Sequence, residues 1–171
     1  MRYPLTKIKK DSVCAEVGVW EGDFSSEILS KNPRELHLID PWIHQEFPWV
    51  KLAKGHKKTE QVFQGVLKKF QNNTRVKIHR KNSTDANFPY GYFDWVYIDA
   101  DHSYDSVIKD LSHFVKFIKP GGYLCGDDYG WNDAVNGCPR GPKEAVDEFV
   151  ERFGLGLEVS SNQFIIKVKR K

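Results

Sequence analysis

The stretch VCAEVGVWEGDFSSEIL, residues 13–29, joins an apolar run to an amphipathic segment through a turn that contains two glycines. Val13–Val19 is an apolar run interrupted by Glu16, which is typical of a strand buried on both faces of a sheet. Apolar residues then recur at helical spacing within Asp23–Lys31. The stretch therefore predicts a strand, a sharp turn and a helix, in that order.

The same alternation of strand-length apolar runs and amphipathic segments continues along the chain. Further strands are expected at Glu35–Ile39, Arg75–His79, Phe93–Ile98, Tyr123–Gly126, Leu155–Val159 and Gln163–Val168, the last two forming a hairpin. Further helices are expected at Lys57–Phe70, Tyr104–Ile118 and Lys143–Phe153, with Lys119–Gly122 as a break before the next strand. This pattern predicts one α/β domain over residues 1–171. Its fold class is a doubly wound, Rossmann-like, mostly parallel seven-stranded sheet with a C-terminal antiparallel hairpin.

Composition limits the classes of function. The chain has 171 residues, of which 40% are hydrophobic and 29% charged, so it should bury a core. A net charge of +3 is too mild to indicate nucleic-acid binding by itself. No apolar run approaches the ~20 residues of a membrane span, and residues 1–11 have no apolar signal core. Three cysteines without metal-type spacing favour a reduced, cytoplasmic protein.

The turn after the first strand has features of a cofactor-binding turn. Gly18 and Gly22 permit a sharp bend and close contact between backbone and ligand, and Glu16 is an acid that needs a partner if buried. A plain strand-to-helix turn is the alternative. A third glycine is missing from the position that the dinucleotide fingerprint requires. Asp40, at the end of the second strand, could accept hydrogen bonds from ribose hydroxyls, although Asp before Pro also terminates strands. Together they suggest a nucleoside-bearing cofactor.

Acidic residues follow the fourth and fifth expected strands. Asp99, Asp101 and His102 come after one, and Asp127 and Asp128 come after the other. Because neighbouring parallel strands end at one edge, these carboxylates should crowd together, which raises their pKa values unless a cation neutralises them. Hard oxygen ligands without thiolates favour Mg²⁺, Ca²⁺ or Mn²⁺. Capping of helices or turns is the alternative, and Asp101, a good cap candidate, is left out of the metal shell.

Two irregular segments, Pro41–Gly55 and Tyr129–Pro142, each follow a strand and should emerge at its carboxyl edge. Ligands bind at that edge in open α/β sheets, and long irregular segments there commonly serve as lids or binding loops. Trp42, Trp49 and Trp131 could stack on a sugar or an aromatic ring. The alternative is that they only plug the edge of the sheet.

The motifs EVGVWEG, IDADHSY, KPGG and GDDY, with the acid after the second strand, together resemble the class I S-adenosylmethionine-dependent methyltransferases. More narrowly, they resemble the small metal-dependent O-methyltransferases of macrolide, aminocoumarin and cephamycin pathways. The resemblance covers about Val13–Phe153, and the two acidic motifs are its specific part.

The resemblance implies S-adenosylmethionine as the cofactor. The methionine part would be held by Glu16, Gly18 and Gly22, and the ribose by Asp40. Ser83 falls where such enzymes contact adenine, although it could also cap a short helix.

The same resemblance assigns a divalent cation, Mg²⁺ or another hard ion, to Asp99, Asp127 and Asp128. His102 stands where related enzymes place a basic residue next to the acceptor, and Asp99, which also belongs to the cofactor site, is the other candidate for general base. The expected reaction is methyl transfer to a hydroxyl of a small-molecule acceptor, a sugar or a secondary metabolite.

Two other functions remain as alternatives. Methylation of nucleic acid would use basic clusters at Lys51–Lys58 and Lys167–Lys171, but the fourth strand ends in IDAD rather than in the Asn/Asp-Pro-Pro-aromatic pattern of amino-methylating enzymes. A catalytically inactive cofactor-binding partner protein is disfavoured by the intact acidic motifs. No membrane partner is expected, and homo-oligomerisation is left open.

Overall fold

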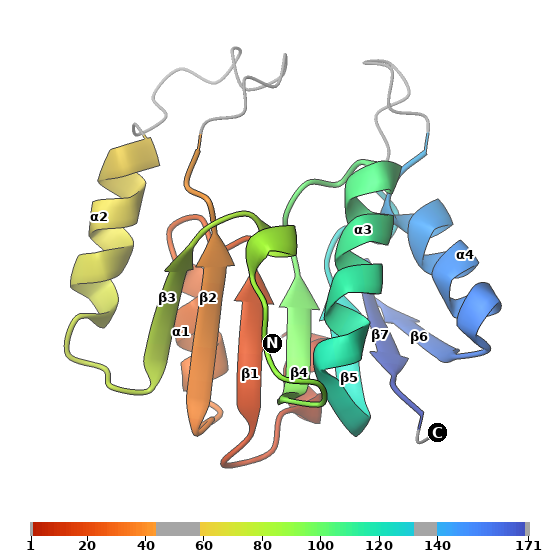
Figure 1. Ribbon diagram of the computed structural model, residues 1–171, viewed down its shortest axis with the longest axis horizontal. Coiled ribbons are helices and arrows are strands. Elements are labelled where there is room, and N and C mark those ends of the chain that lie inside the picture. Colours follow the sequence, from red (N-terminus) through yellow and green to blue (C-terminus); the bar gives the residue numbers. More distant parts are fainter. Residues whose placement is uncertain (1, 44–58, 132–139, 170–171) are drawn as a thin grey trace.

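The computed structural model describes residues 2–43, 59–131 and 140–169. Its strands form one sheet in the order β3-β2-β1-β4-β5-β7-β6 (Figure 1). Their bounds are β1 Val13–Val17, β2 Glu35–Asp40, β3 Val76–Arg80, β4 Phe93–Ile98, β5 Ile118–Gly126, β6 Gly156–Ser160 and β7 Gln163–Lys167. The first five strands are parallel, whereas β7 is antiparallel to both β5 and β6. The predicted fold class, including the closing hairpin, is confirmed.

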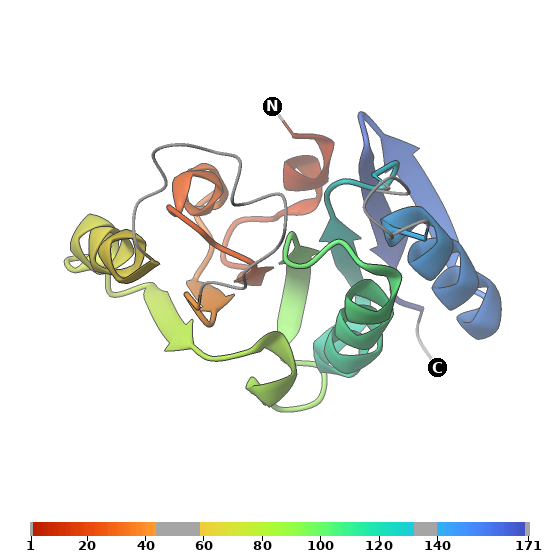
Figure 2. The ribbon, with the colours of Figure 1, turned by 90° about the horizontal axis from the view of Figure 1, so that it is seen from above.

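Helices cover both faces of the sheet (Figure 2). Their bounds are α1 Asp23–Leu29, α2 Thr59–Phe70, α3 Tyr104–Phe114 and α4 Pro142–Phe153, with short 3₁₀ helices η1 Tyr3–Lys7, η3 Ser83–Asp85 and η4 Val115–Phe117. Strand β4 shows why both faces are covered, because its side chains alternate between two cores. Trp95 and Tyr97 belong to the core that includes residues of η1, α1 and α2, while Val96 and Ile98 belong to the core that includes residues of α3 and α4.

The structure differs from the sequence prediction around residues 114–122. The predicted helix ends at Phe114 and continues as η4, and β5 already begins at Ile118, so the KPGG segment lies inside the strand rather than before it. The pairing of β5 with β4 is irregular between Phe93 and Trp95. Gly121 has a φ of +85°, which regular strands do not contain. The irregular part of β5 therefore holds the proline and the glycines that the sequence pattern assigned to a break.

Strand register brings the candidate residues to one edge. Val17 lies beside Ile39 and Ile98, and Ile98 lies beside Gly126. The next residue along each chain segment is Gly18, Asp40, Asp99 or Asp127, so these four lie in one row at the carboxyl ends of the strands, with Asp40 still paired to Arg80 of β3. Among the helices that the structure describes, none is long and apolar enough to cross a membrane.

Candidate functional site

Gly18 is the point at which the turn after β1 touches the turn after β4. Its φ is +85°, and a Cβ atom built on it would lie 2.0 Å from the backbone oxygen of Asp99. A side chain is therefore excluded both by the left-handed backbone and by overlap with main chain. Gly22, with a φ of +72°, immediately precedes α1. The two glycines allow the chain to bend sharply over the ends of β1 and β4.

The Asp40 carboxylate joins the turn after β1 to the end of β2. Its Oδ2 accepts hydrogen bonds from the backbone N–H groups of Val19 at 2.9 Å and Trp20 at 3.1 Å, and its Oδ1 accepts one from Trp42 at 2.6 Å. Hydrogen bonds to an ionised carboxylate are short and strong, so they fix its orientation. Two carboxylate oxygens offer about four acceptor sites, which leaves capacity for a ligand hydroxyl.

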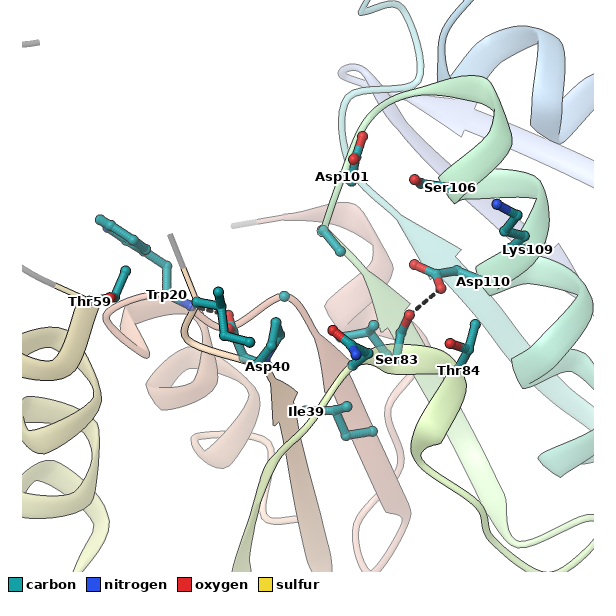
Figure 3. A pocket seen from close by; sticks show the side chains of 16 residues that line it. Trp20, Ile39, Asp40, Thr59, Ser83, Thr84, Asp101, Ser106, Lys109 and Asp110 are labelled. Carbon is teal, nitrogen blue, oxygen red and sulfur yellow. Dashed lines mark hydrogen bonds between the residues drawn. The ribbon is translucent and has the colours of Figure 1, made fainter. Parts of the chain in front are cut away.

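A cavity of about 390 Å³ opens beside these residues (Figure 3). Its walls include apolar side chains at the ends of β1 and β2 and polar side chains from η3, α3 and the loop before α3. The lining contains Gly18, Asp40 and Ser83 of the predicted cofactor-binding residues, and also Asp110, which the sequence analysis did not single out. Ser83 donates a hydrogen bond to Asp110 at 2.5 Å.

Glu16 lies within the sheet rather than on the cavity wall. Its side chain is buried and accepts a hydrogen bond from the Ser25 hydroxyl at 2.5 Å. Burial, opposed by that hydrogen bond, raises the pKa of Glu16 to about 8. The partner of this acid is thus a hydroxyl of α1, rather than a cationic ligand group or a backbone N–H of the turn, and the carboxyl is largely protonated at neutral pH.

Asp99, Asp127 and Asp128 lie close together at a second place on the same edge of the sheet. We call these three carboxylates and His102 the acidic rim. Arg2 donates to Asp127 Oδ2 at 2.7 Å, and its guanidinium lies 3.5 Å from Asp99 Oδ2. The guanidinium also stacks on the ring of Phe24 at 4.3 Å. Burial opposes the charge of Arg2, but its hydrogen bond to Tyr97 and the neighbouring carboxylates raise its pKa. A cation supplied by the chain itself thus lies among the acids.

His102 faces the remaining part of the acidic rim. Its Nε2 lies 3.5 Å from Asp99 Oδ1 and 3.4 Å from Asp128 Oδ2, and this buried atom has no hydrogen-bond partner within the described part of the chain. Burial lowers the pKa of His102, but the carboxylates outweigh it and raise the pKa overall. One ligand atom from each of Asp99, His102 and Asp128 lies within 4.8 Å of the other two. This spacing suits either a shared proton or a metal ion.

Other predicted residues have clear positions. Asp101 is not the cap of α3, because the N-cap residue is Ser103; instead Asp101 accepts a hydrogen bond from the Ser103 N–H at 2.8 Å in the turn before the helix. Trp42 is buried against Phe63, so it plugs the edge of the sheet. Trp131 instead lies beside His102, with ring centroids 5.4 Å apart. Trp49 and the basic cluster Lys51–Lys58 lie outside the described residues.

Sequence reasoning missed two charged residues of these sites. Arg2 belongs to the segment before β1, which contains no motif. Asp110 did leave a signal, because it interrupts the apolar stripe of α3, three residues after Val107 and one before Leu111. An acid at an inward-facing position of an amphipathic helix indicates a buried polar contact.

A family model described as a methyltransferase domain matches residues 15–129, which include the glycine turn, Asp40 and the whole acidic rim. The chain belongs to this family. Its sheet has the class I S-adenosylmethionine-dependent methyltransferase fold.

An uncharacterized protein of Acanthamoeba polyphaga mimivirus is 29% identical to this chain over 128 residues, which are 71% of this chain and 53% of the relative. The chain thus spans about half the length of that relative.

Solved structures agree on the fold. The N-methyltransferase NodS from Bradyrhizobium japonicum WM9 has a TM-score of 0.67 at 13% identity, covering 95% of this chain and 88% of NodS. NodS has also been solved in complex with S-adenosylhomocysteine. An O-methyltransferase family protein from Burkholderia thailandensis has a TM-score of 0.65 at 16% identity, covering 98% of this chain and 53% of that protein.

Proposed function

We propose that the methyltransferase transfers the methyl group of S-adenosylmethionine to a hydroxyl of a small molecule, such as a sugar or a secondary metabolite, at the acidic rim. The observation that carries this proposal is the contact at Gly18. This residue lines the cavity and touches the backbone of Asp99, so the cavity adjoins a histidine flanked by carboxylates. The NodS complex with S-adenosylhomocysteine supports the choice of donor.

The cavity provides the contacts that an adenosine group needs. Asp40 would accept a hydrogen bond from a ribose hydroxyl while it keeps its three backbone donors. Ser83 would lie beside the base. The backbone at Gly18 and Gly22 would approach the methionine part. Glu16 would support that turn through Ser25 rather than by contact with the cofactor, because its carboxyl does not line the cavity.

The reaction requires an acceptor oxygen in line with an electrophilic sulfonium methyl, so placement supplies much of the rate. Neutral His102 would take the proton of the acceptor hydroxyl. Asp99 and Asp128 would then stabilise the imidazolium, because their charges raise the pKa of His102. Activity should therefore increase with pH as the free His102 loses its proton.

The acidic rim also fits a divalent cation. Its buried His102 Nε2 points between Asp99 and Asp128 without a hydrogen-bond partner among the described residues, and Asp127 completes the acidic set while paired with Arg2. Mg²⁺ or another hard divalent ion held there would lower the pKa of an acceptor hydroxyl. Nε2 cannot bind a metal ion and accept a proton at the same time, so His102 would serve either as a ligand of the ion or as the general base, for which Asp99 is the other candidate.

The test is methyl transfer from labelled S-adenosylmethionine to panels of sugars, catechols, amines and RNA, with and without chelator. His102→Gln should lower turnover of the hydroxylated acceptor by ~10²–10⁴-fold and remove the increase with pH, with unchanged cofactor affinity. Asp105→Asn, an exposed acid on α3, is the matched control. Methylation of amines or RNA alone would refute the acceptor class. Full activity in the presence of chelator would refute only the proposed role of a divalent cation.

A further inference from the structure

The outer side of β3 has no neighbouring strand among the strands that the structure describes. β3 is the first strand in the order of the sheet and pairs there with β2 alone (Figure 1). The backbone N–H of Leu36 on β2 donates to the carbonyl of Arg75 at 2.9 Å, and Leu36 lies opposite Val76 in the register. Backbone groups of successive residues point to opposite sides of a strand. The backbone groups of Val76, Ile78 and Arg80 therefore point away from β2.

Most of these outward backbone groups are unpaired. The N–H of Val76 donates to the carbonyl of Asn73 at 3.0 Å within the turn before β3. No backbone hydrogen bond joins the carbonyl of Val76, either group of Ile78 or the N–H of Arg80 to another described residue. A row of free N–H and C=O groups at the edge of a sheet is a template for pairing with another extended chain.

A groove of about 880 Å³ lies beside this edge, between β3 and α2. Figures 1 and 2 both show α2 next to β3, at the outer side of the sheet. Val76 and Ile78 line the groove from β3, Leu67 lines it from α2, and all three side chains are half-buried. A strand added to β3 would thus find backbone partners on one side and an apolar contact surface in the groove.

The charge of the groove favours an acidic occupant. Its lining contains Lys68 of α2 and Lys77 of β3, both exposed, but no aspartate or glutamate. Lys68 forms no ion pair with a described residue, and Lys77 donates to the uncharged carbonyl of Thr74 at 3.1 Å. The β3 strand of a second copy would bring a further Lys77 to this edge, and like charges facing each other across strands are destabilising. The lysines therefore disfavour self-association and attract an acidic segment.

We propose that the free edge of β3 binds an extended, acidic segment of a partner protein, which adds to the sheet as a further strand. The main chain of that segment pairs with Val76, Ile78 and Arg80, and its acidic side chains reach Lys68 and Lys77. Main-chain pairing supplies affinity for many sequences, so the two lysines set the class of partner. Strands β2 and β1 separate this edge from β4 and β5, which lead into the acidic rim, so the interaction does not depend on the proposed reaction.

The test measures backbone hydrogen exchange of the whole chain by NMR, with a capped peptide of alternating glutamate and valine, about six residues long, as the probe. In the free protein, the N–H of Ile78 should exchange faster than that of Lys77, which points to β2. The peptide at about 1 mM should slow exchange at Ile78 and Arg80 at least about tenfold and leave Lys77 nearly unchanged. Binding by charge alone would not produce this alternation along β3.

Two comparisons test the role of charge. A peptide with lysine in place of glutamate should bind at least about tenfold more weakly than the acidic peptide. Lys68→Glu, on the exposed face of α2, should weaken binding of the acidic peptide at least about threefold. Lys116→Glu, which reverses an exposed charge on η4 outside the groove, is the matched control and should bind as the wild type does.

Three outcomes would overturn the proposal. The first is unchanged exchange at Ile78 with the acidic peptide at about 1 mM. The second is equal binding of the acidic and basic peptides, or of the wild type and Lys68→Glu. The third is slow exchange at Ile78 that depends on protein concentration without any peptide, together with a dimer in analytical ultracentrifugation, since a second copy would then occupy the edge. The proposed methyl transfer stands in all three cases, because none of these measurements depends on it.

Discussion

Two groups of carboxylates at one edge of the sheet are stabilised in different ways. In the cavity, Asp40 and Asp110 accept hydrogen bonds from backbone N–H groups or from a hydroxyl. At the acidic rim, three carboxylates face the positive charge of Arg2 and the titratable ring of His102. Donors that belong to the backbone cannot leave, whereas side-chain cations can be displaced by a proton, an ion or a substrate.

This difference matches the tasks proposed for the two sites. A cofactor that is identical in every turnover suits a cavity whose donors and acceptors are fixed in advance. Proton transfer from an acceptor needs groups whose charge can change, which requires the balanced charges of the acidic rim. The predictions below test whether the two regions differ in this way.

The largest effect should come from Gly18, where the two regions touch. Gly18→Ala should destabilise the protein by more than about 4 kcal/mol and abolish cofactor binding, because the new Cβ would overlap the backbone of Asp99. Gly121 has the same φ of +85° but nothing within 4 Å of its Cβ position, so Gly121→Ala should cost only about 1–2 kcal/mol. Urea denaturation measures both. Equal losses would show that backbone strain, not the contact with Asp99, decides the effect.

Glu16 shows a third way in which a carboxyl group is stabilised in this protein, because it is buried and retains its proton. Its pKa is raised from 4.5 to about 8 on folding, so the folded state binds more protons between these values and stability decreases as pH rises. The free energy of unfolding of Glu16→Gln minus that of the wild type should therefore increase by about 1.4 kcal/mol per pH unit between pH 5 and 7, because only the wild type loses stability over this range. Denaturation at several pH values measures this slope. Glu27→Gln, which neutralises an exposed carboxyl on α1, is the control. A flat difference for Glu16→Gln would mean that Glu16 is ionised.

Much of the fold is predictable because burial on both faces gives the parallel strands unbroken apolar runs. Strand β4 was predicted with its observed bounds, Phe93–Ile98. The entry into β5 was not predictable, since the KPGG segment looks like a break until its pairing with β4 is known. Local sequence contains the propensity of a segment but not the register of its neighbour.

The candidate site divides in the same way. Asp40, Asp99 and Asp127 could be found because each follows a strand, and parallel strands end in one row. Arg2 could not be found, because its position depends on the packing of η1, through Leu5, against the sheet. Asp110 could have been found from the apolar stripe that it interrupts, but not its hydrogen bond to Ser83, which joins elements distant in sequence.

Asp40→Ala tests the fixed side of the comparison. Three backbone N–H groups lose a charged acceptor, so the protein should lose about 2 kcal/mol of stability as well as at least about tenfold in affinity for S-adenosylhomocysteine. Calorimetric titration and urea denaturation measure the two losses. Because these hydrogen bonds are local and held by backbone, 1 M NaCl should leave the stability loss nearly unchanged. A loss of affinity without a loss of stability would mean that Asp40 serves the ligand alone.

Arg2→Gln tests the exchangeable side and should have the smallest effect. The Arg2 side chain is 36% exposed, so solvent screens its pairs with Asp127 and Asp99, and the loss should be about 1 kcal/mol at low salt. The Debye length falls from about 10 Å at 0.1 M to about 3 Å at 1 M salt, so 1 M NaCl should remove much of that loss. Arg80→Gln, which breaks the ion pair of Arg80 on β3 with Glu60 on α2, is the control for a surface charge, because the Arg80 side chain is 41% exposed. A loss that persists in 1 M NaCl would mean that Arg2 stabilises the protein by packing on Phe24. Its position would then be as fixed as that of Asp40, and the contrast between the two regions would disappear.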